Sequence, residues 1–179
     1  MKWLFIAAGV LVGLVVVIIA IGALLPREHV ASLSARIAAP PADVWAAITQ
    51  PEQFTMWRAD VTRVEMLAPT PTGPSWREHT RQGALTMAVD AAEPPRRMVT
   101  RILDQNLPYG GQWEYDIAAE GTNESRVTIT ERGWVSNPIF RFVSRFVMGH
   151  TATIDAYLRA LGKRFGSEPV PTAVATRGD

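Results

Sequence analysis

Two ionisable residues stand at positions where the surrounding pattern predicts buried side chains. Glu78 follows Trp76 at a spacing of two in a segment that alternates like a β-strand, so both side chains point to one face. His150 lies one turn beyond Phe146 on the apolar stripe of a helical segment. A buried carboxylate near an imidazole is suited to proton transfer, because burial raises the pKa of a carboxyl group. If the protein is an enzyme, we expect Glu78 and His150 to be its catalytic residues.

These residues, and a third acidic one, also have structural interpretations. Glu78 fits an ion pair with an arginine on a neighbouring strand, such as Arg101, as well as it fits a pocket. Glu131 continues the inward series of its strand, but strand ends commonly reverse their facing through a bulge, which favours a solvated carboxylate. A histidine on an apolar stripe is more often a hydrogen-bonded core residue than a catalyst. The residue types alone therefore leave catalysis open.

Several catalytic and binding motifs are missing from the sequence. It has no cysteine, no Gly-x-Ser-x-Gly elbow, no His-Glu-x-x-His pair and no glycine-rich phosphate loop. Its histidines, His29, His79 and His150, are far apart and lack the spacing of metal ligands. Apart from Lys2, basic and acidic side chains are balanced at 17 each, which argues against a nucleic-acid surface. We expect no metal, no cofactor and no nucleic-acid partner.

The elements that would position these residues follow from the hydrophobic pattern. Alternating segments joined by short turns predict antiparallel strands. The predicted strands are residues 30–38, 61–67, 75–81, 84–92, 97–104, 112–119 and 126–135. After the first strand, residues 42–49 and a turn through Phe54 and Trp57 predict two small helices, separated by Pro51. These elements make an α+β domain with a sheet of about seven strands.

The last apolar segment, residues 138–165, has the period of a helix. Phe142, Phe146 and His150 fall near one stripe, which we expect to lie on the apolar face of the sheet. Gly149 is predicted to divide the segment into a short helix and a longer one. The aromatic residues of the short helix, interleaved with arginines, are also suited to touching a bilayer surface.

The sequence resembles a known family over residues 30–166. The resemblance rests on Ala35-Arg36-Ile37-Ala38-Ala39-Pro40-Pro41-Ala42-Asp43-Val44-Trp45-Ala46-Ala47-Ile48, on Phe54-Thr55-Met56-Trp57, on Val64-Glu65 and on Gly110-Gly111-Gln112-Trp113-Glu114-Tyr115. These segments are similar to the polyketide cyclase/dehydrase and lipid-transport group of START-like (SRPBCC) proteins. The resemblance implies a helix-grip fold, in which a curved antiparallel sheet wraps a long C-terminal helix and leaves an apolar cavity. The same fold serves ligand carriers, cyclases, hydrolases and chaperone co-factors, so it specifies function poorly.

Large apolar side chains on the predicted inner faces are the candidate ligand-binding residues. In this fold the same face forms the core and the cavity wall, so core packing is an equal interpretation. An aromatic and methionine-rich lining suits an apolar ligand. The candidates are Trp57, Trp76, Met87, Met98, Trp113, Tyr115, Phe142 and Phe146.

The N-terminal segment reads as a membrane span, because residues 3–25 contain no charged or strongly polar side chain. A helix rising ~1.5 Å per residue would cover ~34 Å there, enough for a ~30 Å hydrocarbon core. The run is longer than the apolar region of a cleaved signal peptide, which is about 7–15 residues. Gly9 and Gly13 form a Gly-x-x-x-Gly pair through which two such helices could form a weak homodimer. The few flanking basic residues leave the membrane side of the domain open.

We therefore predict a single-pass membrane protein with three parts. Residues 1–26 form a transmembrane anchor, residues 27–166 a helix-grip domain and residues 167–179 a disordered tail. The leading hypothesis is a membrane-anchored domain that binds a hydrophobic small molecule or lipid between the sheet and the C-terminal helix. One alternative is a cofactor-independent cyclase, dehydrase or hydrolase acting on an apolar substrate. A second alternative is an interaction module whose cavity is filled by its own side chains.

Overall fold

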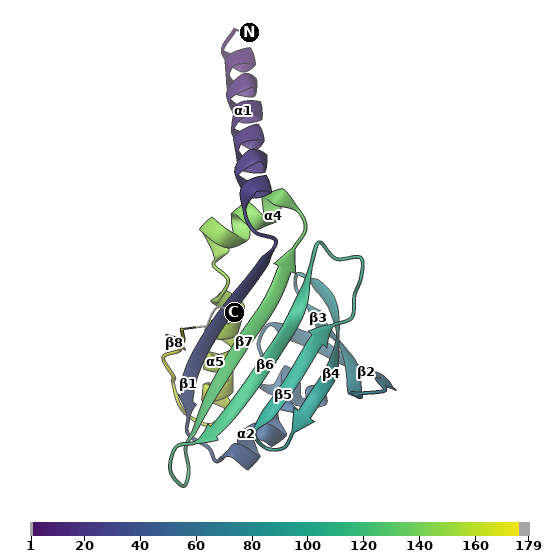
Figure 1. The fold of residues 1–179 in the computed structure, drawn as a ribbon, viewed down its shortest axis with the longest axis vertical. Helices are drawn as coiled ribbons and strands as arrows, with labels where there is room; N and C mark the ends of the chain where they lie inside the picture. Colours follow the sequence, from purple (N-terminus) through teal and green to yellow (C-terminus); the bar gives the residue numbers. More distant parts are fainter. Residues whose placement is uncertain (1, 176–179) are drawn as a thin grey trace.

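The computed structural model describes residues 2–175, and in it an apolar helix stands above a curved antiparallel sheet that wraps a C-terminal helix (Figure 1). The helices are α1 (Lys2–Leu24), α2 (Pro41–Ile48), α3 (Phe54–Trp57), α4 (Pro138–Val143) and α5 (Ala152–Arg164), with a 3-10 turn at Pro51–Gln53 and a π-helical turn at Ser144–Met148. The strands are β1 (Glu28–Ile37), β2 (Val61–Thr70), β3 (Gly73–Thr80), β4 (Gly83–Glu93), β5 (Arg97–Ile102), β6 (Tyr109–Ala119), β7 (Ser125–Val135) and β8 (Thr172–Ala173).

The strands form one sheet in the order β2-β3-β4-β5-β6-β7-β1-β8. From β2 to β7 each strand pairs with the next, which is what their short connections predict. β1 breaks this sequence and pairs with β7, from Glu28 opposite Trp134 to Ile37 opposite Ser125. The predicted α+β helix-grip architecture is confirmed, including two small helices after the first strand.

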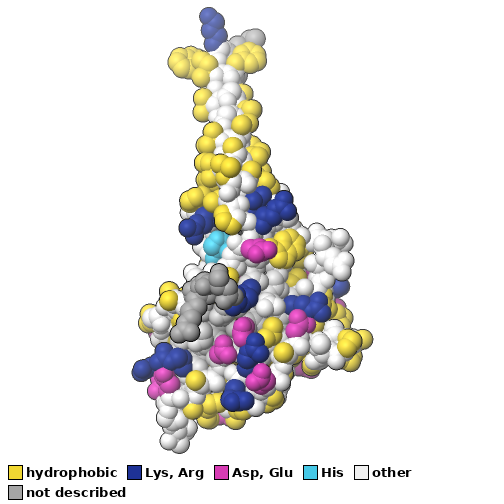
Figure 2. Space-filling view, in the orientation of Figure 1, with side chains coloured by type: hydrophobic (Ala, Val, Ile, Leu, Met, Phe, Trp, Pro, Cys, Tyr) yellow, Lys and Arg dark blue, Asp and Glu magenta, His cyan; other side chains and the backbone are white. Residues whose placement is uncertain are grey.

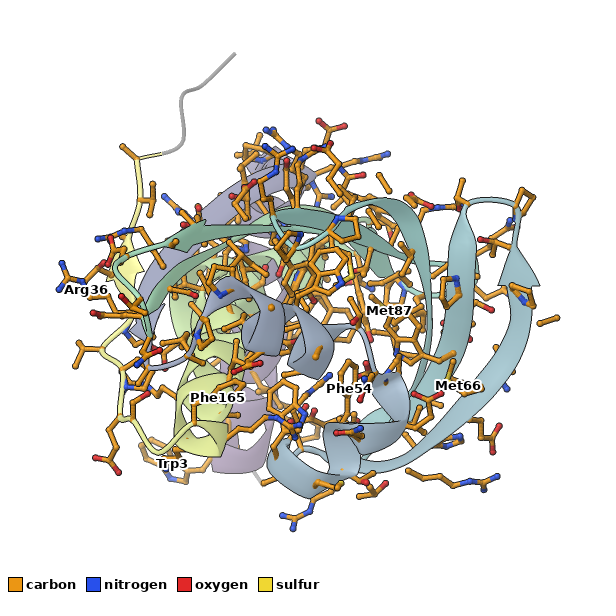
Figure 3. The ribbon with its side chains drawn as sticks, turned by 90° about the horizontal axis from the view of Figure 1, so that it is seen from below. Trp3, Arg36, Phe54, Met66, Met87 and Phe165 are labelled. Carbon is orange, nitrogen blue, oxygen red and sulfur yellow. The ribbon has the colours of Figure 1, made fainter. Side chains whose placement is uncertain are left out.

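The core lies on the concave face of the sheet. α5 packs over β1 and β7, and α2 and α3 cover the end of the sheet opposite to α1 (Figure 3). Figure 3 shows Phe54 and Met87 facing the enclosed space, whereas Met66 and Arg36 lie at the periphery. The fully buried apolar side chains come mainly from β1, α2, β7 and α5 and include Ile37, Val44, Ile48, Val127, Ile129, Ile154, Leu158 and Leu161.

α1 is long and apolar enough to cross a membrane, and only 6% of its apolar stretch Phe5–Leu24 is buried against the rest of the chain. Side chains of the apolar class cover its length in Figure 2. Its last turn packs on α4, where Gly22 approaches Pro138 so closely that an added Cβ would overlap the Pro138 backbone. The surroundings of Gly9 and Gly13 are open, so their role in a homodimer stays a prediction.

The end of the chain differs from the sequence-based expectation, whereas the break at Gly149 agrees with it. Thr172 and Ala173, in the predicted disordered tail, form the short strand β8 on Ser34 and Leu33 of β1, so the sheet has eight strands rather than about seven. A two-residue strand has no detectable alternation, which explains why the pattern missed it. Residues 176–179 of the tail lie outside the described residues. Gly149, with φ of +74°, ends the π-helical turn and separates it from α5, so the predicted division is confirmed.

The packing of the tail on α5 predicts an unusual sign for one substitution. Replacing a helical glycine by alanine normally stabilises by ~1 kcal/mol, but a Cβ at Gly162 would overlap the ring of Pro169. Gly162→Ala should therefore lower the melting temperature of the full chain. In a chain that ends at residue 166 the same substitution should raise it. Thermal unfolding in detergent measures both, and a change of the same sign in the two chains would contradict the observed position of the tail.

Candidate functional site

The first polar cluster on the concave face surrounds Glu78. Both oxygens of this buried carboxylate are occupied: Arg58 Nη1 lies 2.9 Å from Oε2, and Trp76 Nε1 donates to Oε1 over 2.9 Å. Arg58 also donates through Nη2 to Asp60 over 2.7 Å. The interpretation of Glu78 as an ion-paired residue is correct, but its partner is Arg58 and not Arg101, which pairs with Asp90.

Arg58 is held in its charged form although it is largely buried. Burial opposes the charge, but the ion pair with Glu78 and the contact with Asp60 outweigh it and raise the pKa of Arg58 above its ordinary value. The guanidinium also lies 5.3 Å from the ring centre of Phe54 and 5.2 Å from that of Tyr157. Both oxygens of the Glu78 carboxyl group are therefore held by the protein's own side chains.

Aromatic side chains fill the space between this cluster and the rest of the concave face. Tyr157 of α5 packs against the rings of Trp57, Trp113 and Tyr115, with centroid distances of 5.3, 5.6 and 5.9 Å. Burial raises the pKa of both Tyr115 and Tyr157, so both phenols are neutral. These contacts occupy the region between the sheet and α5, where the resemblance placed a cavity.

The second polar cluster, called here the histidine cluster, consists of His29, Trp113, Glu131 and His150. Glu131 Oε1 lies 3.0 Å from His29 Nε2, and its Oε2 accepts a hydrogen bond from Trp113 Nε1 over 2.7 Å. His150 stacks on His29 with ring centres 4.1 Å apart. The expectation of a solvated Glu131 is therefore wrong: its strand keeps the inward alternation to this point, and two partners hold the carboxylate.

The structure does not bring Glu78 and His150 together. Each belongs to its own cluster, and the aromatic rings of Tyr157 and Trp113 lie between the two. Burial, and then the neighbouring His29 and Arg145, lower the pKa of His150, while Glu131 opposes this shift. The imidazole of His150, stacked on His29, is able to accept a proton in its neutral form. Glu78 would take no part in this transfer, because it belongs to the other cluster.

An apolar hollow of about 180 Å³ lies under α2, at the end of the sheet remote from α1. Two of the predicted ligand-binding residues, Trp76 and Met98, line it. The other walls come from α2, from the 3-10 turn and from β3 and β4: Trp45, Ile48, Thr49, Pro51, Pro74, Val89 and Ala92. Among these residues only Thr49 and the indole groups of Trp45 and Trp76 can form side-chain hydrogen bonds, so the hollow suits an apolar group. A second hollow of about 260 Å³ opens on the convex face between Arg101, Arg132 and Trp134.

The remaining predicted ligand-binding residues have other places. Trp57, Trp113 and Tyr115 belong to the aromatic filling, and Met87 packs partly buried against the core. Phe142 and Phe146 contact each other, with ring centres 5.0 Å apart, on the segment beside α1, and Phe146 is 60% exposed. The expectation that both face the sheet is corrected: the break at Gly149 turns α4 away, so the stripe does not continue into α5.

Arg58, His29 and Tyr157 are the participants that sequence reasoning missed. An inward Glu78 requires a cation, but the choice of Arg58 depends on how α3 packs against β2 and α5, which no local pattern specifies. The alternation of the first strand could have indicated His29. When β1 begins at residue 28, His29 shares the inward face of Ala31 and Leu33. Among residues 2–175, no three His, Asp or Glu side chains are grouped as metal ligands would be.

Comparisons with known proteins agree with this architecture. Residues 28–166 match the sequence profile of the family described as "Polyketide cyclase / dehydrase and lipid transport". No curated protein sequence matches the chain.

Solved structures share the fold at low sequence identity. A START superfamily protein from Mycobacterium smegmatis is similar over 77% of this chain and 97% of its own, with a TM-score of 0.63 and 16% identity. The Zhui aromatase/cyclase from Streptomyces sp. R1128 is similar over 78% and 94%, with a TM-score of 0.64 and 13% identity. Norcoclaurine synthase from Thalictrum flavum is similar over 77% and 94%, with a TM-score of 0.62 and 10% identity.

Removing one partner of the buried ion pair should be costly. Arg58→Met leaves the Glu78 carboxylate buried without its cation, and we expect it to lower the free energy of unfolding by ~3–5 kcal/mol. Adding Glu78→Gln should recover most of this loss, because the amide still accepts from Trp76. Arg101→Met, which breaks an exposed pair, is the control and should cost less than ~1 kcal/mol. Chemical denaturation measures all four chains, and a double variant as unstable as Arg58→Met would contradict the assignment.

The histidine cluster predicts an acid-sensitive stability. Because the pKa of His150 is lowered in the folded protein, the unfolded chain binds more protons, and stability is lost as the pH falls from the ordinary histidine value through the lowered one. The melting temperature should fall between pH 7.5 and pH 5. His150→Phe keeps an aromatic ring against His29 and should flatten this profile. An unchanged pH profile in that variant would show that another group causes the loss.

Proposed function

This chain belongs to the polyketide cyclase/dehydrase and lipid transport family through residues 28–166, and from the apolar hollow under α2 we propose that it is a binding domain for a hydrophobic small molecule. The hollow is the observation that carries the proposal. Its walls are apolar and come from separate elements, as in most small-molecule sites. The membership supports a ligand-handling role, because the family includes lipid-transport proteins.

The volume of the hollow limits the ligand. A dry cavity of ~150 Å³ accommodates benzene, whereas drug-sized ligands occupy ~300–1,000 Å³. At about 180 Å³ the hollow takes one ring or a short branched chain. The ligand is therefore a small lipophile, or a larger molecule that inserts only one apolar group.

The anchor is the second part of the proposal. α1 tethers the binding domain to a bilayer as a single-pass helix, and two observations support this. Its length matches the hydrocarbon core, and its side chains are exposed rather than packed against the domain, unlike those of a core helix. The domain then works at a fixed distance from lipid.

A second candidate function is an interaction module without a ligand. The aromatic filling around Tyr157 favours it, because the region between the sheet and α5 is packed by the protein's own side chains. An enzyme using Glu78 as its base is not favoured, since Arg58 and Trp76 occupy both carboxylate oxygens.

Closing the hollow tests the proposal. Ala92 lies at its exposed rim, so Ala92→Trp should fill it with little cost to the core. Ala91→Trp, one residue away and not part of the wall, is the matched control. Small aromatic and branched aliphatic probes should raise the melting temperature of the natural chain and the control but not of Ala92→Trp. Native mass spectrometry of the purified protein reports a retained lipid or lipophile. If no probe shifts the melting temperature and nothing co-purifies, the interaction module is correct instead.

A further inference from the structure

The segment of residues 138–147, called here the interfacial segment, has an apolar surface that no other described part of the chain covers. Ile139 and Phe140 on α4 are 43% and 52% exposed, and Phe146 and Val147 on the π-helical turn are 60% and 72% exposed. Arg145 is exposed among them. Exposed apolar side chains gathered in this way commonly mark a membrane or protein contact, and here four large ones lie within ten residues.

The interfacial segment is fixed to the end of α1. Arg141, which is 7% exposed, points inward and donates through Nη1 to the Leu25 carbonyl over 2.7 Å and to the Ala23 carbonyl over 3.5 Å. It thereby caps the last carbonyls of α1 with a positive charge, which suits the negative end of a helix. Asn137 begins α4 by accepting a hydrogen bond from the Ile139 backbone over 2.8 Å. These contacts hold the segment across the base of α1 (Figure 1).

The exposed residues beside the base of α1 are of the types that concentrate at the boundary between lipid and water. The backbone N–H of Val135 donates a hydrogen bond to the Arg27 carbonyl over 2.8 Å. This contact places Trp134 and Val135 beside the base of α1. Trp134 and Tyr109 are 39% and 42% exposed. Trp and Tyr gather at membrane interfaces, and Figure 2 shows Lys and Arg side chains on both sides of the base of α1.

We propose that the interfacial segment is a second membrane contact, which lies in the headgroup layer of a phospholipid bilayer beside α1. This proposal rests on the anchoring role of α1 given above, since the end of a spanning helix sets the depth of whatever is bound to it. Two contacts fix the orientation of the domain, whereas a single flexible tether would leave it free to swing. The apolar patch is then buried in lipid in the working protein.

Spin labels can locate the segment, because the chain has no natural cysteine and any introduced one is unique. We suggest Phe146→Cys and Val147→Cys in the full chain, reconstituted in phosphatidylcholine/phosphatidylglycerol nanodiscs. Val12→Cys, in the middle of α1, is the lipid control. Thr122→Cys, in the turn between β6 and β7 at the opposite end of the domain, is the aqueous control. Collisions with oxygen report lipid, and collisions with a water-soluble nickel chelate report water.

The expected result is a several-fold higher ratio of oxygen to nickel collisions at positions 146 and 147 than at 122, and a lower ratio than at 12. Labels at 146 and 147 that behave like 122, while 12 lies in lipid, would overturn the interfacial contact and leave the anchor intact. Labels shielded from both reagents would indicate a second copy of the chain on this surface and would also overturn it. A water-exposed label at 12 would refute the anchor itself, and the proposed contact with it.

Discussion

The pairing of β1 with β7 is the constraint on which the rest of the structure depends. β1 is the first strand in the chain, yet it pairs with the last long strand over its whole length. This long-range pairing provides the surface on which α5 lies and brings the end of α1 next to α4. It also places His29 beside Glu131, so the histidine cluster exists only when the register is correct. A slip of one residue would turn every inward side chain of β1 to the solvent.

The ion pair of Glu78 and Arg58 is linked to the aromatic packing between the sheet and α5. A carboxylate without a partner in this position would cost several kcal/mol, and the cation that satisfies it is drawn in from the loop after α3. Arg58 in turn stacks under Tyr157, whose ring meets Trp57, Trp113 and Tyr115. These side chains pack against one another between the sheet and α5. The apolar hollow lies beside this packing, under α2.

The sequence predicted the elements better than the contacts between them. Alternation predicts seven of the strands, because the two faces of a strand differ in polarity. The glycine at 149 predicts the helix break, because a positive φ favours glycine. The sequence suggests a strand neighbour such as Arg101 as one possible partner of Glu78, because strand neighbours can be inferred. The approach of Arg58 depends on the packing of α3. Phe142 and Phe146 were placed on the sheet because a continuous stripe was assumed through Gly149. The pairing of β8 with β1 was missed because two residues carry no period.

The hollow and the anchor lie at opposite ends of β1, and this separation bears on how a ligand reaches the site. α1 precedes Glu28, whereas α2, which roofs the hollow, follows Ile37. Ten residues of strand span ~33 Å, so with α1 in a bilayer, as proposed, the hollow would open about that far from the membrane. A lipid with two long chains would have to leave the membrane entirely before it could enter, and 180 Å³ holds only a small part of it. Under the proposed anchoring, volume and position would therefore both favour a ligand that crosses water, and the bilayer would position the domain rather than supply its ligand.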